Sequence, residues 1–241
     1  MSILTAVIGS MGAGVAATGF AAPWSAATVI GTACAGGYYA GRIIDAGVTY
    51  ALIVSPKASG QNGNATLAYK TTSDAAPAAA RTLTNGLAAS TAMNSAAYPA
   101  AQYCRSLSIN TYSDWYLPAR DELEVLYRNL KPTTGANHVA AAWRTNATFG
   151  TTGGYGMDGG AEGYNANSSP VGAAYTSSAP LRTTVTAFQS TGTEPFVALS
   201  YWSSTECTAT DAWSQDFTNG PQYLDNKTSA YYVRAVRRVA V

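Results

Sequence analysis

The sequence predicts a domain that mixes α-helices and β-strands, preceded by an uncharged N-terminal arm. Three observations support this prediction: no residue from 1 to 41 is charged, residues 114–130 have the spacing of an amphipathic helix, and strand-like runs occur at 48–54 and after residue 200. A chain of 241 residues is long for one domain and short for two. We therefore expect an arm, residues 1–41, and one domain, residues 42–241.

The arm is rich in Ala, Gly, Thr and Val, and Arg42 is the first charged residue. It lacks the basic start of a secretory signal, and its glycines and Pro23 interrupt it too often for a transmembrane helix. A segment of this composition buries too little apolar surface to offset the entropy of ordering its backbone. We expect the arm to dock on neighbouring subunits, and packing on its own domain is the alternative.

The first half of the domain contains one clear strand and one short helix. Val48 to Val54 form a continuous β-branched and aromatic run that stops at Pro56, which indicates a buried strand. Residues 57–86 show little periodicity and are expected to be loop. Residues 99–107 suit a short helix with Pro99 in its first turn, which makes Cys104 a small buried hydrophobic residue.

The strongest local pattern is an amphipathic helix that ends before Pro132. Its apolar residues fall at i, i+3, i+4 and i+7, namely Leu123, Leu126, Tyr127 and Leu130. Three acids lie in its first turns, Asp121, Glu122 and Glu124, where they complement the helix dipole. We expect these acids to be solvated; a metal or acid–base cluster is the alternative reading.

A long, weakly charged region separates this helix from the last strands, with five charged residues between Pro132 and Thr205. Loops of this length are usually functional or disordered. Within residues 153–178, Tyr155, Tyr164 and Tyr175 stand among Gly, Asn and Ser, a composition similar to that of antibody binding loops. We interpret the three tyrosines as ligand contacts, with a plain surface loop as the alternative.

Three strands are expected near the C-terminus, at residues 201–206, 212–217 and 231–239. Asn219-Gly220 marks a turn between the last two. Alternation places Trp213 and Phe217 on one inward face. The three arginines of the last strand, Arg234, Arg237 and Arg238, form either an anion site or pairs with local acids.

Composition narrows the possible functions. Charged residues make up 11% of the chain, with a net charge of +1, whereas nucleic-acid binding needs clustered Lys and Arg. His138 is the sole histidine, which disfavours most acid–base and metal chemistry, so we expect no enzyme and no cofactor. Two catalytic alternatives stay formally open: the pair Cys104 and Cys207, and a triad that uses Ser203 or Ser204.

Several motifs in a fixed order resemble a known family. They are Asp114-Trp115-Tyr116-Leu117-Pro118 with Glu122-Leu123 after it, the run YWSSTE at 201–206, the spacing of Trp213, Phe217 and Gly220, and the closing VRAVRRV at 233–239. Together they resemble the C-terminal domain family of collagen-like adhesins. The runs GGYYAGRI at 36–43 and LIVSPKASG at 52–60 are similar to those of phage tail-fibre and virion surface proteins that carry this domain.

The resemblance implies an α+β, C-type lectin-like fold with two helices, a twisted antiparallel sheet and long loops. In that fold the variable loops and the outer strand face bind ligands, which here corresponds to residues 153–178, 208–211 and 222–230. The candidate ligand-binding residues are Tyr155, Tyr164, Tyr175, Thr208, Asp211 and Tyr223.

The resemblance also implies a location and partners. The expected function is that of a phage structural protein on the virion surface, a tail fibre or receptor-binding protein that contacts a host surface glycan or outer-membrane protein. Residues 1–41 would then bind other virion proteins, and a homo-oligomer is the default. The alternative is a capsid decoration or tail component with no receptor role.

Two departures from the related proteins matter. Relatives tend to place Thr at the position of Ala119, and the loss of that cap, worth about 1 kcal/mol, puts the start of the helix in doubt. Calcium-dependent lectins carry Glu-Pro-Asn and Trp-Asn-Asp motifs, whereas this chain has Glu194-Pro195-Phe196 and Trp213-Ser214-Gln215-Asp216. We therefore expect no bound metal.

Overall fold

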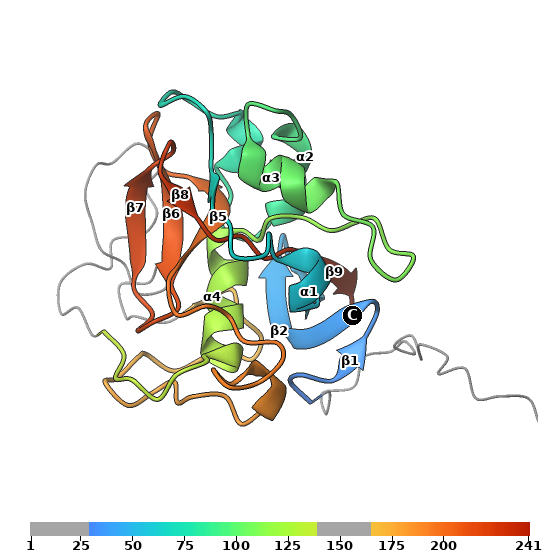
Figure 1. Cartoon of the computed structure of the whole chain (residues 1–241), viewed down its shortest axis with the longest axis vertical. Helices are drawn as coiled ribbons and strands as arrows, with labels where there is room; N and C mark the ends of the chain where they lie inside the picture. Colours follow the sequence, from blue (N-terminus) through green and yellow to red (C-terminus); the bar gives the residue numbers. More distant parts are fainter. Residues whose placement is uncertain (1–28, 139–164) are drawn as a thin grey trace, which may run out of the picture.

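The computed structural model describes residues 29–138 and 165–241 and shows a mixed α+β fold, as expected (Figure 1). The predictions for residues 1–28, and those for Tyr155 and Tyr164, lie outside the described residues. No helix in the described ranges is long and apolar enough to cross a membrane.

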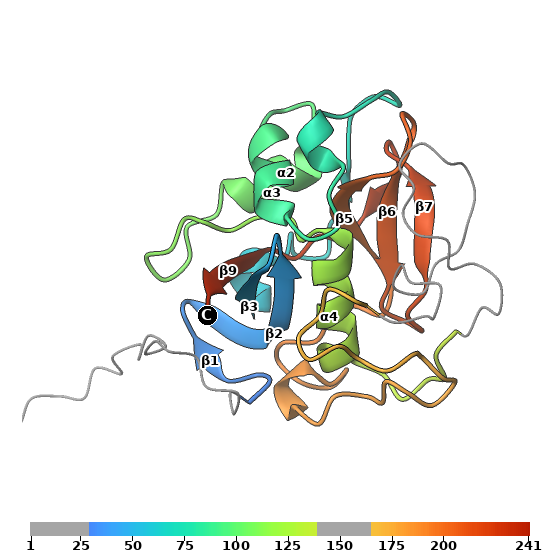
Figure 2. The same ribbon diagram turned by 180° about the vertical axis from the view of Figure 1, so that it is seen from behind.

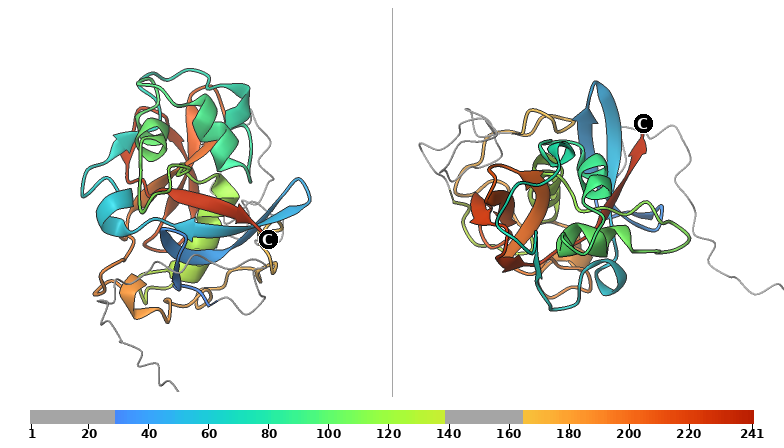
Figure 3. Two further views of the ribbon diagram at one scale, coloured as in Figure 1. Left: turned by 90° about the vertical axis from the view of Figure 1, so that its right-hand side faces the viewer. Right: turned by 90° about the horizontal axis from the view of Figure 1, so that it is seen from above.

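The first sheet joins the two ends of the domain. Its order is β1 (Ala33–Cys34), β2 (Gly37–Asp45), β3 (Val48–Val54) and β9 (Val236–Ala240), and every pair is antiparallel. The bounds of β3 match the predicted strand. Figure 3 shows the last strand running to the C-terminus beside the blue strands. The expected boundary between residues 41 and 42 is wrong, because it falls inside β2 and residues from 29 onward already belong to the domain.

The second sheet contains β5 (Ser200–Glu206), β6 (Asp211–Asp216) and β7 (Gln222–Asn226) in that order, all antiparallel. A separate pair joins β4 (Leu67–Ala68) to β8 (Ala230–Tyr231). The predicted strands at 201–206 and 212–217 are confirmed. The single strand expected at 231–239 is divided between β8 and β9, which lie in different sheets.

Helix α4 (Arg120–Leu130) lies between the two sheets and contacts β2, β5 and β6 (Figures 1 and 2). The short helix expected at 99–107 is α3 (Pro99–Arg105). Two further helices, α1 (Lys57–Gly60) and α2 (Gly86–Ala92), and 3-10 turns at Ala78–Ala80 and Thr186–Phe188 were not predicted. They are short and rich in small residues, so no apolar periodicity marks them.

The core has two parts. One lies around α2 and α3 and includes Trp115, Trp202 and Cys104, and the other surrounds α4. All four apolar residues predicted for α4 are buried, as are Trp213 and Phe217. The expectation that the three acids of α4 are solvated is wrong: Asp121 is 2% exposed, and Glu122 and Glu124 are 0% exposed. A helix between two sheets has no solvated side, so these acids need buried partners.

The C-terminal arginines pair with acids from other segments. Pairing with acids, and not an anion site, is therefore the interpretation that the structure supports. Arg234 contacts Glu194 at 2.7 Å, Arg237 contacts Asp114 at 2.7 Å, and Arg238 contacts Asp45 at 3.0 Å. The three cysteines are buried free thiols, as expected for Cys104.

Candidate ligand-binding site

Three turns meet at one end of the β5–β6–β7 sheet, and we call this group the apex: residues 70–76, 207–211 and 226–229 (Figure 1). The amide of Asn226 donates to the hydroxyl of Ser73 at 2.8 Å, and the backbone N–H of Lys70 donates to the carbonyl of Lys227 at 3.0 Å. The backbone N–H of Lys227 donates to the carbonyl of Thr210 at 3.0 Å, so the apex also brings two of the predicted ligand-binding segments, 208–211 and the end of 222–230, into contact.

Thr208 and Asp211 shape the turn between β5 and β6. The Thr208 hydroxyl donates to Oδ2 of Asp211 at 2.8 Å and accepts the Asp211 backbone N–H at 2.9 Å. The hydroxyl of Thr210 donates to the same carboxylate oxygen at 2.7 Å. Thr208 is 7% exposed and Asp211 is half-buried, so of the two predicted contacts only Asp211 is substantially open to a ligand.

Tyr223 lies on β7, the edge strand of the sheet, opposite Ser214 of β6. It is half-buried. Its place on the outer strand agrees with the ligand-binding face that the resemblance implies, and its role in binding stays a prediction.

Tyr175 lies in the core, which is the opposite of what a ligand-contact role requires. It is 6% exposed, and its hydroxyl donates to Oε1 of Glu124 at 2.6 Å. Its ring lies 5.9 Å from that of Tyr127, and the Arg128 guanidinium lies 4.7 Å from its centroid. The Tyr175 ring, which suggested a binding loop, packs against α4.

The buried acids of α4 fasten the segment that contains Tyr175. Besides Tyr175, Glu124 accepts Nε of Arg128 at 2.9 Å and Nδ2 of Asn165 at 2.8 Å. Asp121 accepts Nδ2 of Asn167 and Nε of Arg120, both at 2.8 Å. Three side chains, those of Asn165, Asn167 and Tyr175, thus hold residues 165–175 against α4, and the acids are satisfied by charged, amide and hydroxyl donors.

Glu122 faces the other side of the helix and is fully buried. Its Oε1 accepts the Tyr116 hydroxyl at 2.8 Å, and its Oε2 accepts the backbone N–H groups of Ala119 at 2.8 Å and Gly86 at 3.2 Å. Burial raises the pKa of the Glu122 carboxyl to about 7, against the opposing effect of these donors. Glu122 joins the starts of α2 and α4.

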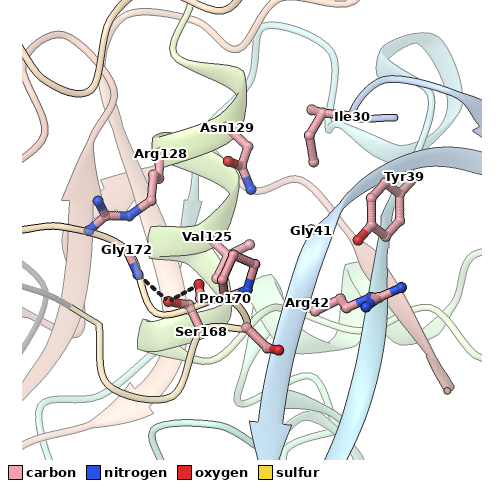
Figure 4. Close-up of a pocket in the computed structure, with 11 residues that line it drawn as sticks. Ile30, Tyr39, Gly41, Arg42, Val125, Arg128, Asn129, Ser168, Pro170 and Gly172 are labelled. Atoms are coloured by element: carbon pink, nitrogen blue, oxygen red, sulfur yellow. Dashed lines mark hydrogen bonds between the residues drawn. The ribbon is translucent and has the colours of Figure 1, made fainter. Parts of the chain in front are cut away.

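A pocket of about 300 Å³ opens beside β2, and no pattern in the sequence predicts it (Figure 4). A bulge at residues 39–41 interrupts the β2–β3 register, and residues 167–169 hydrogen-bond to residues 42–44 on the edge of β2 that faces away from β3. The lining residues come from three separate parts of the chain: Ile30, Tyr39, Gly41, Arg42, Val125, Arg128, Asn129, Ser168, Ser169, Pro170 and Gly172. A glycine inside a strand is the signal of a bulge, and Gly41 provided it.

The walls of this pocket are fixed by hydrogen bonds. Asn129 donates from Nδ2 to the Ala40 carbonyl at 2.8 Å, and Ser169 donates its backbone N–H to the Arg42 carbonyl at 3.2 Å. The Ser168 hydroxyl accepts the Gly172 N–H at 3.2 Å. Figure 4 shows Arg42, from β2, and Arg128, from α4, on opposite sides of the opening. Polar groups on rigid elements around an apolar floor suit a small polar ligand.

Several of the residues considered for catalysis are buried: Ser203, Ser204, Cys104 and Cys207. Ser203 is 1% exposed and donates to the Trp213 carbonyl at 2.8 Å, while His138 is exposed. Burial raises the pKa of the Cys104 thiol, which opposes formation of the reactive thiolate. Over the described ranges, no group of three His, Cys, Asp or Glu side chains could hold a metal ion.

Comparison with known proteins gives one match. No curated protein and no solved structure matches the chain. The model of the Lcl C-terminal domain family matches residues 61–237, which include the helices α2 to α4, the whole β5–β6–β7 sheet and the apex. The matched span covers most of the chain and most of the fold described above, and the chain therefore belongs to the Lcl C-terminal domain family.

Proposed function

We propose that this chain is an adhesion protein on the surface of a virion, a tail fibre or receptor-binding protein whose domain contacts a glycan or an outer-membrane protein of the host. The pocket beside β2 is the observation that supports this proposal most directly. It is open, its walls come from a strand, a helix and a hydrogen-bonded loop, and its rim offers guanidinium, amide and hydroxyl groups. Such groups recognise the hydroxyls and carbonyls of a saccharide.

The low charge of the chain supports the same proposal. With a net charge of +1 and 11% charged residues, long-range attraction contributes little to binding. Recognition then depends on short-range contacts of modest strength. In this proposal the chain is a homo-oligomer whose N-terminal arm binds other virion proteins, and many copies on one particle supply the avidity.

The test is binding of the labelled full-length chain to candidate host cells, with one variant for each candidate surface. Arg42→Ala removes a pocket wall and Tyr223→Ala alters the outer strand. If the pocket binds the receptor, Arg42→Ala weakens binding by about tenfold, which is typical of a central interface residue, and Tyr223→Ala does not. Thermal unfolding of both variants verifies that the fold is intact.

The other outcomes assign other roles. Weaker binding by Tyr223→Ala alone moves the site to the outer strand of the second sheet. A wild-type chain that joins particles but binds no host cell contradicts the receptor role. That result favours the capsid decoration or structural tail component that the sequence left as an alternative.

A further inference from the structure

The ammonium group of Lys227 sits in a cage of oxygen atoms inside the apex. Its Nζ donates to the carbonyls of Asp74 at 2.9 Å, Thr208 at 3.0 Å and Ala209 at 2.6 Å. Oε2 of Glu206 lies 3.5 Å away. The Lys227 side chain is 0% exposed, so all of these contacts are shielded from water.

The oxygens of the cage come from two different turns of the apex. Asp74 belongs to residues 70–76, and Thr208 and Ala209 belong to the turn between β5 and β6. An ammonium group has three N–H donors, and three backbone carbonyls satisfy all of them. Without a cation at this point the carbonyls and the Glu206 carboxylate would face one another in the interior, which is costly.

Several backbone carbonyls and one carboxylate are also the oxygen donors that proteins use to bind hard cations. We propose that Lys227 acts as a tethered cation that holds two turns of the apex together, and that the same cage binds a free primary ammonium ion when this side chain is shortened. The apex is then organised without any dissolved divalent cation.

The charges around the cage favour a monovalent occupant. Lys70 and Arg81 lie nearby, with Lys70 Nζ 2.8 Å from the Asp74 carboxylate and Arg81 3.2 Å from that of Glu206. With Lys227 removed, two cations and two carboxylates remain, and one monovalent ion restores the native balance. The N···O distances of 2.6–3.0 Å are those of hydrogen bonds, and two of the three, 2.9 and 3.0 Å, exceed the 2.3–2.6 Å typical of calcium ligands.

The test compares Lys227→Ala with Lys227→Met in the full-length chain. The alanine variant leaves the space of three methylenes and an ammonium, which n-propylammonium matches, whereas methionine fills that space with an apolar chain. We expect both variants to unfold about 5–15 °C below wild type, because each leaves a buried carboxylate and carbonyls without a donor. Added n-propylammonium chloride should raise the melting temperature of the alanine variant only.

Tetramethylammonium chloride at the same ionic strength is the control, because it carries the charge but no N–H donor. If both salts raise the melting temperature of Lys227→Ala equally, the proposal is overturned, because that result would show that Lys227 only balances the charge of Glu206. An alanine variant as stable as wild type would also overturn it. Lys57→Ala, at a half-buried lysine outside the apex, gives the cost of removing an ordinary lysine.

A second measurement needs only the wild-type chain, and it decides the matter if Lys227→Ala does not fold in any of these salts. Hydrogen exchange of the backbone amides of residues 70–76 and 207–211 is followed in EDTA and in calcium chloride. A tethered cation predicts equal protection in the two buffers. Protection that falls by tenfold or more in EDTA would show that a dissolved divalent ion organises the apex, and the proposal would be wrong.

Discussion

The hydroxyl oxygen of Thr205, on β5, accepts the backbone N–H of Arg120, the first residue of α4, at 2.9 Å. Ala119 occupies the N-cap position and has no side-chain acceptor. Its own N–H is bound by Glu122, and the Asp121 N–H reaches the Leu83 carbonyl at 3.0 Å. The cap that was expected to be missing is therefore supplied by other parts of the fold, which explains how the helix begins at Arg120 without a side-chain cap from Ala119.

Replacing Thr205 by its isostere valine should lower the free energy of unfolding by about 1–3 kcal/mol. The change leaves the Arg120 N–H without an acceptor and also removes the hydrogen bond from Thr205 to the Thr82 carbonyl, 2.7 Å long. Urea unfolding measures the difference. Thr91→Val is the control, because the exposed Thr91 hydroxyl bonds only within α2, and an equal loss in the two variants would contradict the capping role.

Glu122 should make stability depend on pH between about 4.5 and 7. Burial raises its pKa in the folded chain above that of the unfolded chain, so the folded state binds the proton more tightly. The stability gained from this tighter proton binding is fully present below the pKa of the unfolded chain and is lost as the pH rises through about 7. The free energy of unfolding should fall by at most about 3 kcal/mol over this window.

Glu122→Gln is the matched variant for this measurement. Its amide oxygen can accept the Ala119 and Gly86 N–H groups, and its NH₂ can donate to the Tyr116 hydroxyl. Urea unfolding at several pH values should show a smaller slope for the variant than for wild type. Parallel pH profiles for the two proteins would assign the dependence to other groups.

The parts of the fold with strong local patterns could be predicted from the sequence. The spacing of Leu123, Leu126, Tyr127 and Leu130 gave α4, and the unbroken run from Val48 to Val54 gave β3. In contrast, β7 has no apolar alternation, and its strand character comes from pairing with β6. The α2 helix has a local signal, the Asn85 side chain that accepts the Ala88 N–H, but no periodicity to support it.

The site was harder to predict because its parts are distant in sequence. The pocket is formed by residues near 40, 125 and 170, and no local pattern links them. The acids of α4 were expected in solvent because their partners, Asn165, Asn167 and Tyr175, lie more than forty residues away. The apex turn 208–211 was located by family resemblance, whereas the buried position of Lys227 beneath it was not foreseen.

Tyr175→Phe should separate packing from ligand binding. The change removes the hydroxyl that donates to Glu124, while Arg128 and Asn165 still donate to the same carboxylate. We expect a loss of about 1–2 kcal/mol in the free energy of unfolding and no change in binding to host cells. Tyr223→Phe, at a half-buried position, is the control and should cost less. Weaker cell binding by folded Tyr175→Phe would restore Tyr175 as a ligand contact.

Gly41 permits the close approach of α4 to the β2 bulge that forms the pocket floor. Its φ is +130°, and a Cβ atom there would lie 2.6 Å from both Nδ2 of Asn129 and Cγ1 of Val125. Gly47, in the β2–β3 turn, has φ +80° and open space around its Cβ position. Gly41→Ala should therefore cost about 2–4 kcal/mol and Gly47→Ala about 1 kcal/mol, because only the first adds overlap to backbone strain.

A double variant tests whether overlap explains the excess cost at Gly41. Asn129→Ala removes one of the two overlapping groups, so Gly41→Ala should cost less in that background, whereas the cost of Gly47→Ala should not change. Urea unfolding is measured for wild type, for Gly41→Ala, Gly47→Ala and Asn129→Ala, and for the two double variants with Asn129→Ala. These six free energies of unfolding give one double-mutant cycle for each glycine. Strict additivity at Gly41 and Asn129 would mean that overlap with Asn129 does not contribute to the cost. The cost would then come from the backbone conformation and from Val125, the other group that the added Cβ atom would meet.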